Sequence, residues 1–95
     1  MIPEHRIPTH PGEILAEEFL APMEIPQTKL AEKLGVSVQR INELVNGKRG
    51  ITPETAWLLA GAFGTTPEFW TNLQTAYDLA KARPDHPVKR IASAR

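Results

Sequence analysis

Apolar residues recur along this chain at the spacing of α-helices, and proline and glycine mark where the helices end. The first predicted helix spans about residues 11–20, because its apolar positions fall on one stripe between Pro11 and Pro22. The same reasoning predicts four further helices, over about residues 27–34, 37–46, 53–63 and 67–83. No stretch alternates with period two for long enough to predict a strand. The sequence therefore predicts an all-α domain.

Residues that cap helices stand at several of the predicted boundaries. Ser37, Thr52 and Thr66 occupy N-cap positions, where a hydroxyl accepts a hydrogen bond from an unpaired backbone N–H. Thr52 and Thr66 are each followed by proline and glutamate, which suit the first turn of a helix. Gly35 follows the second predicted helix and can adopt the left-handed conformation that ends a helix and turns the chain.

The two short helices around Gly35 have the spacing of a helix-turn-helix. Counted from Ala31, the glycine follows at +4, and the apolar residues Val36 and Ile41 follow at +5 and +10. A small side chain at Ala31 lets the second helix cross the first closely, and the two apolar residues fill the joint. The pattern predicts a helix-turn-helix over residues 27–47.

The second helix of this pair has one apolar face and one face rich in amides. Gln39, Asn42 and Asn46 share the polar face, and Arg40 lies on its flank. Asn and Gln can bond adenine through two hydrogen bonds, so this face has the chemistry of major-groove readout. An ordinary solvated polar face is the alternative, but the turn signature and the nearby basic residues favour readout.

Residues on either side of that helix suit contacts with phosphate. Gln27 opens the first helix of the pair, where backbone N–H groups attract anions. Asn46, Lys48 and Arg49 follow the second helix in a polar loop that could clamp a DNA backbone without reading its sequence.

Arg40 and Glu43 each allow two interpretations. Arg40 could bond guanine or a phosphate, and both possibilities stay open. Glu43 could accept a hydrogen bond from a cytosine amino group, or it could hold Arg40 at i,i+3, which we favour.

Charge changes the picture only locally. The chain has 95 residues, room for one domain, and its 11 basic and 11 acidic residues give a net charge of zero. Residues 27–50 nevertheless carry five basic and two acidic side chains and lie between acidic blocks. Most short charge clusters are simply solvated, so this block adds modest support for phosphate binding.

The sequence lacks the residues that several other kinds of functional site require. The chain has no cysteine, which removes disulfides, thiolate zinc sites and cysteine nucleophiles. His5, His10 and His86 lack metal-ligand spacing, so surface or capping roles are expected for them. The acidic residues of the first helix have no nucleophile signal beside them. No apolar run is long enough to span a bilayer, and no secretory signal is visible. We expect a cytoplasmic protein with no metal, cofactor or enzymatic activity.

Large apolar residues gather in the C-terminal half. Phe69, Trp70, Leu73 and Tyr77 lie on the last predicted helix, and Trp57 lies on the fourth. They could close the core over the first helix or form a dimer face, and we expect both. Trp70 and Tyr77 are seven residues apart and therefore share one side, so they are the first choices for the interface.

The chain divides into a domain and a tail. Residues 1–83 are predicted to form a helix-turn-helix DNA-binding domain that ends in a dimerisation helix. Residues 84–95 contain two prolines, have a net charge of +2, and are predicted to form a flexible basic tail. The pattern does not decide whether the tail adds phosphate contacts or touches a partner.

Three segments resemble the HigA/VapI-type antitoxins, members of the Xre group of helix-turn-helix regulators. They are THPGEILAEEFL, QTKLAEKLGVSVQRINELVNGKRGITPETA and FGTTPEFWTNLQTAYDL, which together span roughly residues 9–80. The resemblance implies a five-helix, lambda-repressor-like DNA-binding domain. It also implies a homodimer that binds a palindromic operator in double-stranded DNA and represses its own operon. The implied partner is a RelE-like, HigB-type toxin, a ribonuclease that cuts mRNA on the ribosome and is neutralised in the complex.

The resemblance further implies roles for individual residues. The residues that read bases would be Ser37, Val38, Gln39, Arg40 and Asn42. The residues that contact phosphate would be Gln27, Asn46, Lys48 and Arg49. Val38 departs from the polar residue common at its position in the family and could instead touch a thymine methyl group.

The leading hypothesis is an operator-binding repressor that also acts as an antitoxin. One alternative is a stand-alone Xre-family transcriptional regulator without a toxin partner. The other is a toxin-sequestering interaction module that does not bind DNA. An enzyme is the least expected of these classes.

Overall fold

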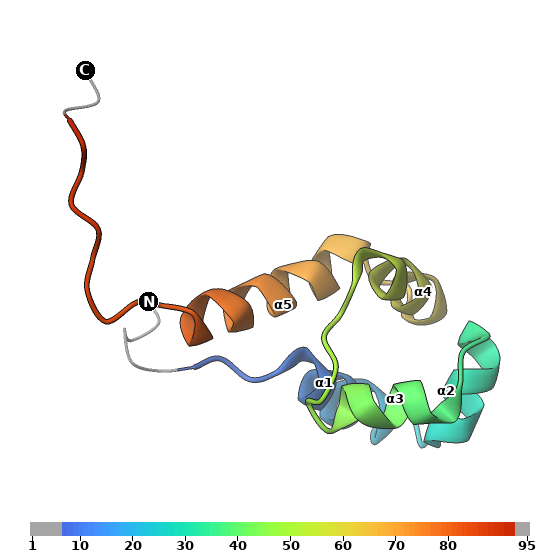
Figure 1. Cartoon of the computed structure of the whole chain (residues 1–95). Helices are drawn as coiled ribbons and strands as arrows, with labels where there is room; N and C mark the ends of the chain where they lie inside the picture. The colour runs from blue at the N-terminus through green and yellow to red at the C-terminus, as the bar shows by residue number, and fades with distance from the viewer. Residues whose placement is uncertain (1–6, 93–95) are drawn as a thin grey trace.

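Residues 7–92 are described by the computed structural model of this chain, so His5 and the last three residues of the predicted tail lie outside it. The helices follow in the order α1 (Pro11–Ile14), η1 (Leu15–Leu20), α2 (Gln27–Leu34), α3 (Val38–Val45), α4 (Pro53–Phe63) and α5 (Pro67–Lys81). Since η1 continues α1 directly, the predicted five-helix, all-α fold is confirmed, and the described part contains no strand. Figure 1 shows α5 running outward from α4, away from the α2–α3 pair.

The predicted caps form as expected. The hydroxyl of Ser37 accepts a hydrogen bond from the backbone N–H of Arg40 at 3.1 Å, which starts α3. Thr52 and Thr66 start α4 and α5 in the same way. Gly35 ends α2 with a φ of 74°, in the left-handed region that glycine adopts without strain.

The first helix differs from the prediction in its hydrogen bonding. From Leu15 to Leu20 it is a π-helix, in which N–H groups bond to the carbonyl five residues earlier. The buried residues explain this. Leu15 and Leu20 are both buried, but in an α-helix two positions five apart would point about 140° away from each other. The wider turn brings both side chains into the core, while the acidic residues of this segment stay exposed.

Trp70 belongs to the core, so its prediction as a dimer-interface residue is wrong. Its side chain has no exposed surface, and the indole N–H donates to the hydroxyl of Thr65 at 2.8 Å. Its ring centroid lies 5.1 Å from that of Phe19 and 6.5 Å from that of Phe63. Helical spacing showed which residues share a side of α5, but not whether that side faces inward. The other half of the prediction, that aromatic residues close the core over the first helix, is confirmed.

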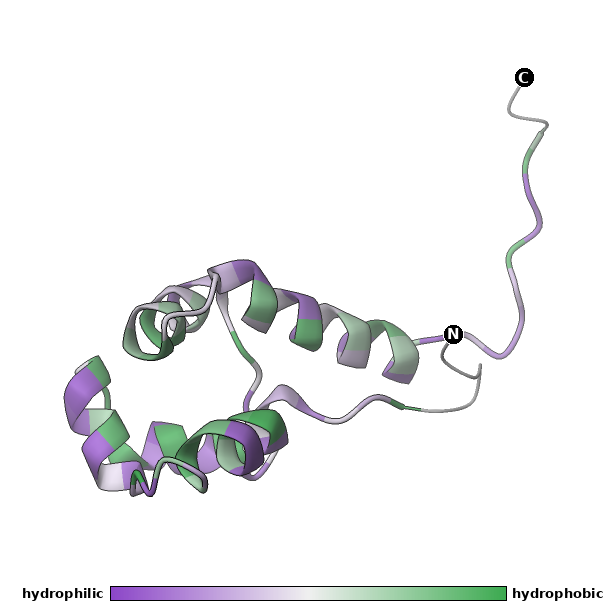
Figure 2. Ribbon diagram, turned by 180° about the vertical axis from the view of Figure 1, so that it is seen from behind, coloured by the Kyte–Doolittle hydropathy of each residue, from purple (hydrophilic) through white to green (hydrophobic). Residues whose placement is uncertain are grey.

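The other three residues of the predicted dimer face lie at or near the surface. The side chain of Phe69 is 38% exposed, and those of Leu73 and Tyr77 are half-buried. Tyr77 packs edge-on against His10, with 4.8 Å between ring centroids. Figure 2 shows hydrophobic and hydrophilic residues alternating along α5, and the helix carries both buried and exposed positions.

Gly12 allows α1 to lie directly against the backbone of α3. A Cβ atom added at Gly12 would lie 1.6 Å from the carbonyl oxygen of Leu44. His10 caps this short helix through Nδ1, which accepts from the N–H of Gly12 at 2.8 Å, so the capping role expected for it is confirmed. Burial lowers the pKa of the His10 imidazole, and the carboxylate of Asp78 partly opposes that effect.

The loop after α3 is attached to α5. The backbone N–H of Ile51 donates to the side-chain oxygen of Gln74 at 2.6 Å. The amide nitrogen of Gln74 in turn donates to Asp78 at 2.9 Å, within α5. The segment that follows the second helix of the helix-turn-helix is therefore fixed to the last helix of the domain.

Candidate nucleic-acid interface

Helices α2 and α3 form the predicted helix-turn-helix. Ala31 and Ile41 are both buried between the two helices, and Val36 is half-buried at the turn. The N–H of Val36 bonds back to the carbonyl of Ala31 at 3.0 Å, which closes the turn after Gly35. The small, glycine and apolar positions therefore have the roles that their spacing predicted.

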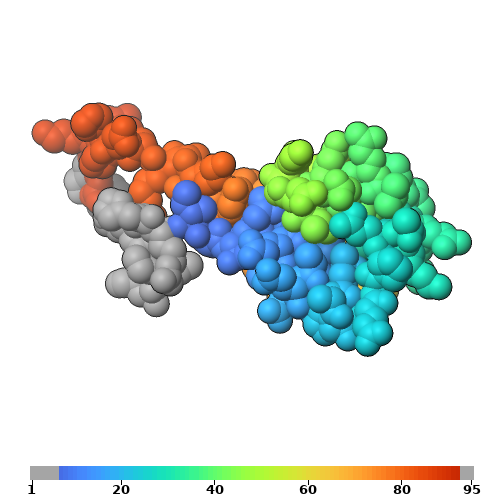
Figure 3. Space-filling model, turned by 90° about the horizontal axis from the view of Figure 1, so that it is seen from below, coloured from blue at the N-terminus to red at the C-terminus, as the bar shows by residue number. Residues whose placement is uncertain are grey.

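The amide-bearing face of α3 points into solvent. Gln39, Asn42 and Asn46 are exposed, whereas Ile41 and Leu44 on the opposite face are 1% and 0% exposed. Ser37 is also exposed, and so is Val38 at 45%. Apart from Arg40, the residues predicted to read bases are thus exposed to solvent. Figure 3 shows this end of the molecule lying opposite the C-terminal residues.

Three amides connect the start of α2 to the exposed face of α3. Asn46 donates from Nδ2 to Oδ1 of Asn42 at 3.2 Å, and Asn42 donates from Nδ2 to Oε1 of Gln27 at 3.2 Å. Gln27 is half-buried at the first position of α2. The structure therefore brings together two residues predicted to contact phosphate and one predicted to read bases.

Glu43 holds Arg49 and Gln39 rather than Arg40, so our expectation for this carboxylate is wrong. Its Oε1 accepts from Nε of Arg49 at 3.1 Å and from Nη2 at 2.9 Å, and its Oε2 accepts from Nε2 of Gln39 at 3.2 Å. The hydrogen bonds from Arg49, and then the one from Gln39, hold the pKa of the Glu43 carboxyl below its usual range. The physical reason is the turn at Gly47, whose φ of 74° directs the chain back along α3.

Arg40 faces the start of α4 instead of the centre of the amide face. Its Nη2 donates to the hydroxyl of Thr55 at 2.8 Å and lies 3.5 Å from a carboxylate oxygen of Glu54. The Arg40 side chain is 25% exposed, so it lies at the edge of the interface. Sequence reasoning missed Thr55, which is buried, because nothing in the local pattern connects the first turn of α4 with α3.

The remaining phosphate-contact candidates are adjacent residues that follow α3. Lys48 and Arg49 are exposed in the loop after α3, as predicted for a phosphate-contacting segment.

Among the described residues, no group of His, Asp or Glu side chains gathers as metal ligands would. Every helix of residues 7–92 is also too short or too polar to cross a bilayer.

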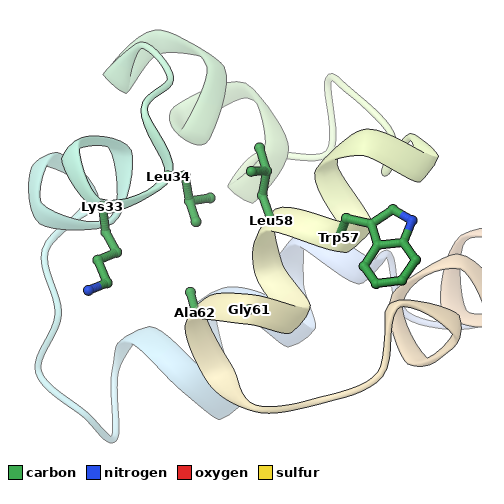
Figure 4. A pocket seen from close by; sticks show the side chains of 6 residues that line it. All are labelled: Lys33, Leu34, Trp57, Leu58, Gly61 and Ala62. Atoms are coloured by element: carbon green, nitrogen blue, oxygen red, sulfur yellow. The ribbon is translucent and has the colours of Figure 1, made fainter.

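A separate shallow groove lies between α2 and α4. It encloses about 230 Å³ and is lined by Lys33, Leu34, Trp57, Leu58, Gly61 and Ala62 (Figure 4). The side chain of Trp57 is 69% exposed, so this aromatic residue belongs to the surface and not to the core.

Comparisons with known proteins agree with this geometry. The helix-turn-helix family model matches residues 17–70. Virulence-associated protein I of Dichelobacter nodosus is 53% identical over 76 residues, which cover 80% of this chain and 70% of that protein.

Two solved structures extend the similarity to proteins bound to DNA. The Pseudomonas aeruginosa antitoxin HigA with the higBA promoter has a TM-score of 0.77 and 45% identity, covering 79% of this chain and 82% of that one. The antitoxin GraA in complex with its operator has a TM-score of 0.85 and 37% identity, covering 98% of this chain and 100% of that one. The second similarity covers almost the whole of this chain.

Proposed function

This chain belongs to the Xre-type helix-turn-helix family, and we propose that it is a sequence-specific DNA-binding antitoxin that represses its own operon. The observation that carries the proposal is the exposed amide face of α3, set on a buried joint with α2. That arrangement offers donors and acceptors to base edges in a major groove while the two helices hold each other in place. The similarity to antitoxins with promoter or operator DNA supports the same role.

The proposed contacts divide by position on this surface. Gln39 and Asn42 would read base edges, with Ser37 and Val38 beside them at the start of α3. Gln27, Asn46, Lys48 and Arg49 would contact phosphates and fix the register of the protein on the duplex. We assign Arg40 to the residues that contact phosphates and not to those that read bases, because its guanidinium lies toward α4 and away from the amides.

We propose that α5 forms the dimer interface. Phe69 on this helix is 38% exposed, and Leu73 and Tyr77, four and eight residues further on, are half-buried on the same side of the helix. A small domain gains stability by covering such a face, and a two-fold dimer suits a palindromic operator. Residues 84–92, which are exposed and lie beyond α5, would add phosphate contacts or touch a partner.

We propose a RelE-like, HigB-type toxin as the second partner, on the strength of the similarity to antitoxins. The protein would bind DNA and toxin in the cytoplasm and would catalyse no reaction. A reading frame beside its gene that encodes a small basic ribonuclease would supply the toxin. Co-expression tests this point: the ribonuclease should arrest growth alone and should co-purify with this protein without arrest. If growth arrest persists in the presence of this protein, the antitoxin function is refuted and a transcriptional regulator without a toxin partner is favoured.

Binding to a duplex spanning the gene's own promoter tests the DNA-binding function. The double variant Gln39→Ala/Asn42→Ala should lose about 30-fold or more in affinity, because each base-reading residue contributes roughly 1–3 kcal/mol and 1.4 kcal/mol is about tenfold. Glu18→Ala truncates an exposed polar side chain on η1, outside α3 and α5, and is the control, with dimer mass measured alongside. Unchanged promoter affinity in the double variant would show that this face does not read DNA, and would favour a module that only sequesters a toxin.

A further inference from the structure

Glu43 is the one acidic residue of α3, and it lies on the edge of the face that the proposed function turns toward DNA. A carboxylate there is repelled by phosphates and should lower affinity for any duplex. Its position is therefore unexpected unless its contacts compensate for that repulsion.

The contacts of Glu43 join two residues with different proposed tasks. One carboxylate oxygen accepts two hydrogen bonds from the guanidinium of Arg49, at 3.1 and 2.9 Å. The other accepts one hydrogen bond from the side-chain amide of Gln39, at 3.2 Å. Arg49 lies in the phosphate-contacting loop, and Gln39 lies on the base-reading face, so a single side chain contacts both groups.

The bond to Gln39 fixes the direction of its amide. Because one N–H of Nε2 donates to Glu43, the exposed Gln39 side chain keeps its carbonyl oxygen Oε1 and its second N–H for a base edge. An acceptor beside a donor is the pair that matches the edge of adenine. Without a carboxylate at position 43, the amide could rotate by 180° and present its groups in the reverse order.

The bonds to Arg49 reduce its attraction to phosphate. The guanidinium is paired through two nitrogen atoms to one oxygen, and 46% of the side chain remains exposed. A phosphate of random-sequence DNA must compete with Glu43 for this cation. Contact between Arg49 and DNA therefore requires the ion pair to open or to share its hydrogen bonds.

We propose that Glu43 is a specificity-determining positioning residue, which lowers affinity for random DNA by pairing Arg49 and sharpens base readout by orienting Gln39. This inference rests on the proposed DNA-binding function. On this proposal Glu43 does not accept a hydrogen bond from cytosine, and it does not hold Arg40 in place.

Two variants at position 43 test the proposal. Glu43→Gln and Glu43→Ala should each bind poly(dI-dC) about 5- to 10-fold more tightly than the wild type at about 0.1 M salt, since one further cation becomes free to contact phosphate. The slope of log affinity against log salt should steepen by about one for both. The ratio of promoter affinity to poly(dI-dC) affinity should fall by a similar factor.

Controls separate the possible causes. Glu18→Gln removes the same charge from the exposed face of η1 and should change poly(dI-dC) affinity much less. Combining Glu43→Ala with Arg49→Ala should abolish most of the gain in affinity. If affinity for poly(dI-dC) increases in Glu43→Gln but not in Glu43→Ala, the glutamine has formed a new base contact and the proposal is overturned. A gain in affinity that persists in the variant without Arg49 would also overturn it.

The wild type distinguishes failure of this inference from failure of the proposed function. If the wild type binds its promoter and poly(dI-dC) but the variants at position 43 bind both as it does, only the role of Glu43 is refuted. If the wild type shows no salt-dependent binding to either duplex, the DNA-binding function fails and this inference fails with it.

Discussion

Replacing Gly12 with alanine should destabilise the protein more than a single added methyl group normally does. The added Cβ would lie 1.6 Å from the carbonyl oxygen of Leu44 and 2.6 Å from its carbonyl carbon. Ordinary contacts between such atoms are about 3.5 Å long, so α1 and α3 must separate by roughly 2 Å. Both obstructing atoms belong to the backbone of a helix and cannot rotate away, unlike a flexible side chain.

The expected cost follows from the packing that this separation disrupts. A gap of only about 0.5–1 Å already removes a quarter to a half of the dispersion energy between facing atoms. Overpacking in a core costs about 1–3 kcal/mol, and a backbone obstruction places Gly12→Ala at or above about 3 kcal/mol. A domain of this length has a free energy of unfolding of roughly 5–14 kcal/mol, so the loss is a substantial fraction.

Urea denaturation followed by circular dichroism measures this effect. With a slope of about 1–1.5 kcal/mol per molar urea, the unfolding midpoint should fall by about 2–3 M. Gly61→Ala is the matched control, because Gly61 lies within α4 and nothing is within 4 Å of its added Cβ. That substitution should stabilise the protein by about 0.5–1 kcal/mol. A loss below about 1 kcal/mol for Gly12→Ala would refute the close contact between α1 and α3.

Three further substitutions test other parts of the structure. Thr55→Val removes the hydroxyl that Arg40 contacts and should cost about 1–2 kcal/mol in urea unfolding; a neutral result would show that this buried bond contributes nothing. The pKa of His10 is lowered in the folded state, so the unfolded chain binds more protons and stability should fall as the pH drops below about 6.5. His10→Asn keeps a capping side chain without titrating, and an equally steep pH dependence in that variant would assign the effect to another group. Phe69→Asp should convert the proposed dimer to a monomer in sedimentation, whereas a persistent dimer would place the interface away from this residue.

The sequence predicted those features that depend on neighbours close along the chain. The caps at Ser37 and Thr52, the turn at Gly35 and the exposure of Gln39 each follow from a few adjacent residues. Capping, left-handed turns and helical faces have local physical causes, so a linear pattern is sufficient to identify them.

The features that the sequence did not predict depend on how separate helices meet. Arg40 contacts Thr55, which is fifteen residues away and has no periodic relation to it. Glu43 pairs with Arg49 because the chain reverses at Gly47, and the close approach at Gly12 depends on the angle between two helices. Trp70 illustrates the same limit, because spacing assigns residues to a side of a helix while the tertiary fold decides which side is covered.

The hydrogen bond from Ile51 to Gln74 has a consequence for the geometry of the proposed dimer. This hydrogen bond anchors the loop that begins at the end of α3. The acceptor, Gln74, belongs to α5, the helix that would lie at the two-fold axis of the dimer. Any rotation of one α5 against the other would therefore reorient both reading helices, whose half-sites must lie about 34 Å or a multiple of it apart on the duplex. A ligand that altered packing at the axis would change operator affinity without touching a single DNA-contacting side chain.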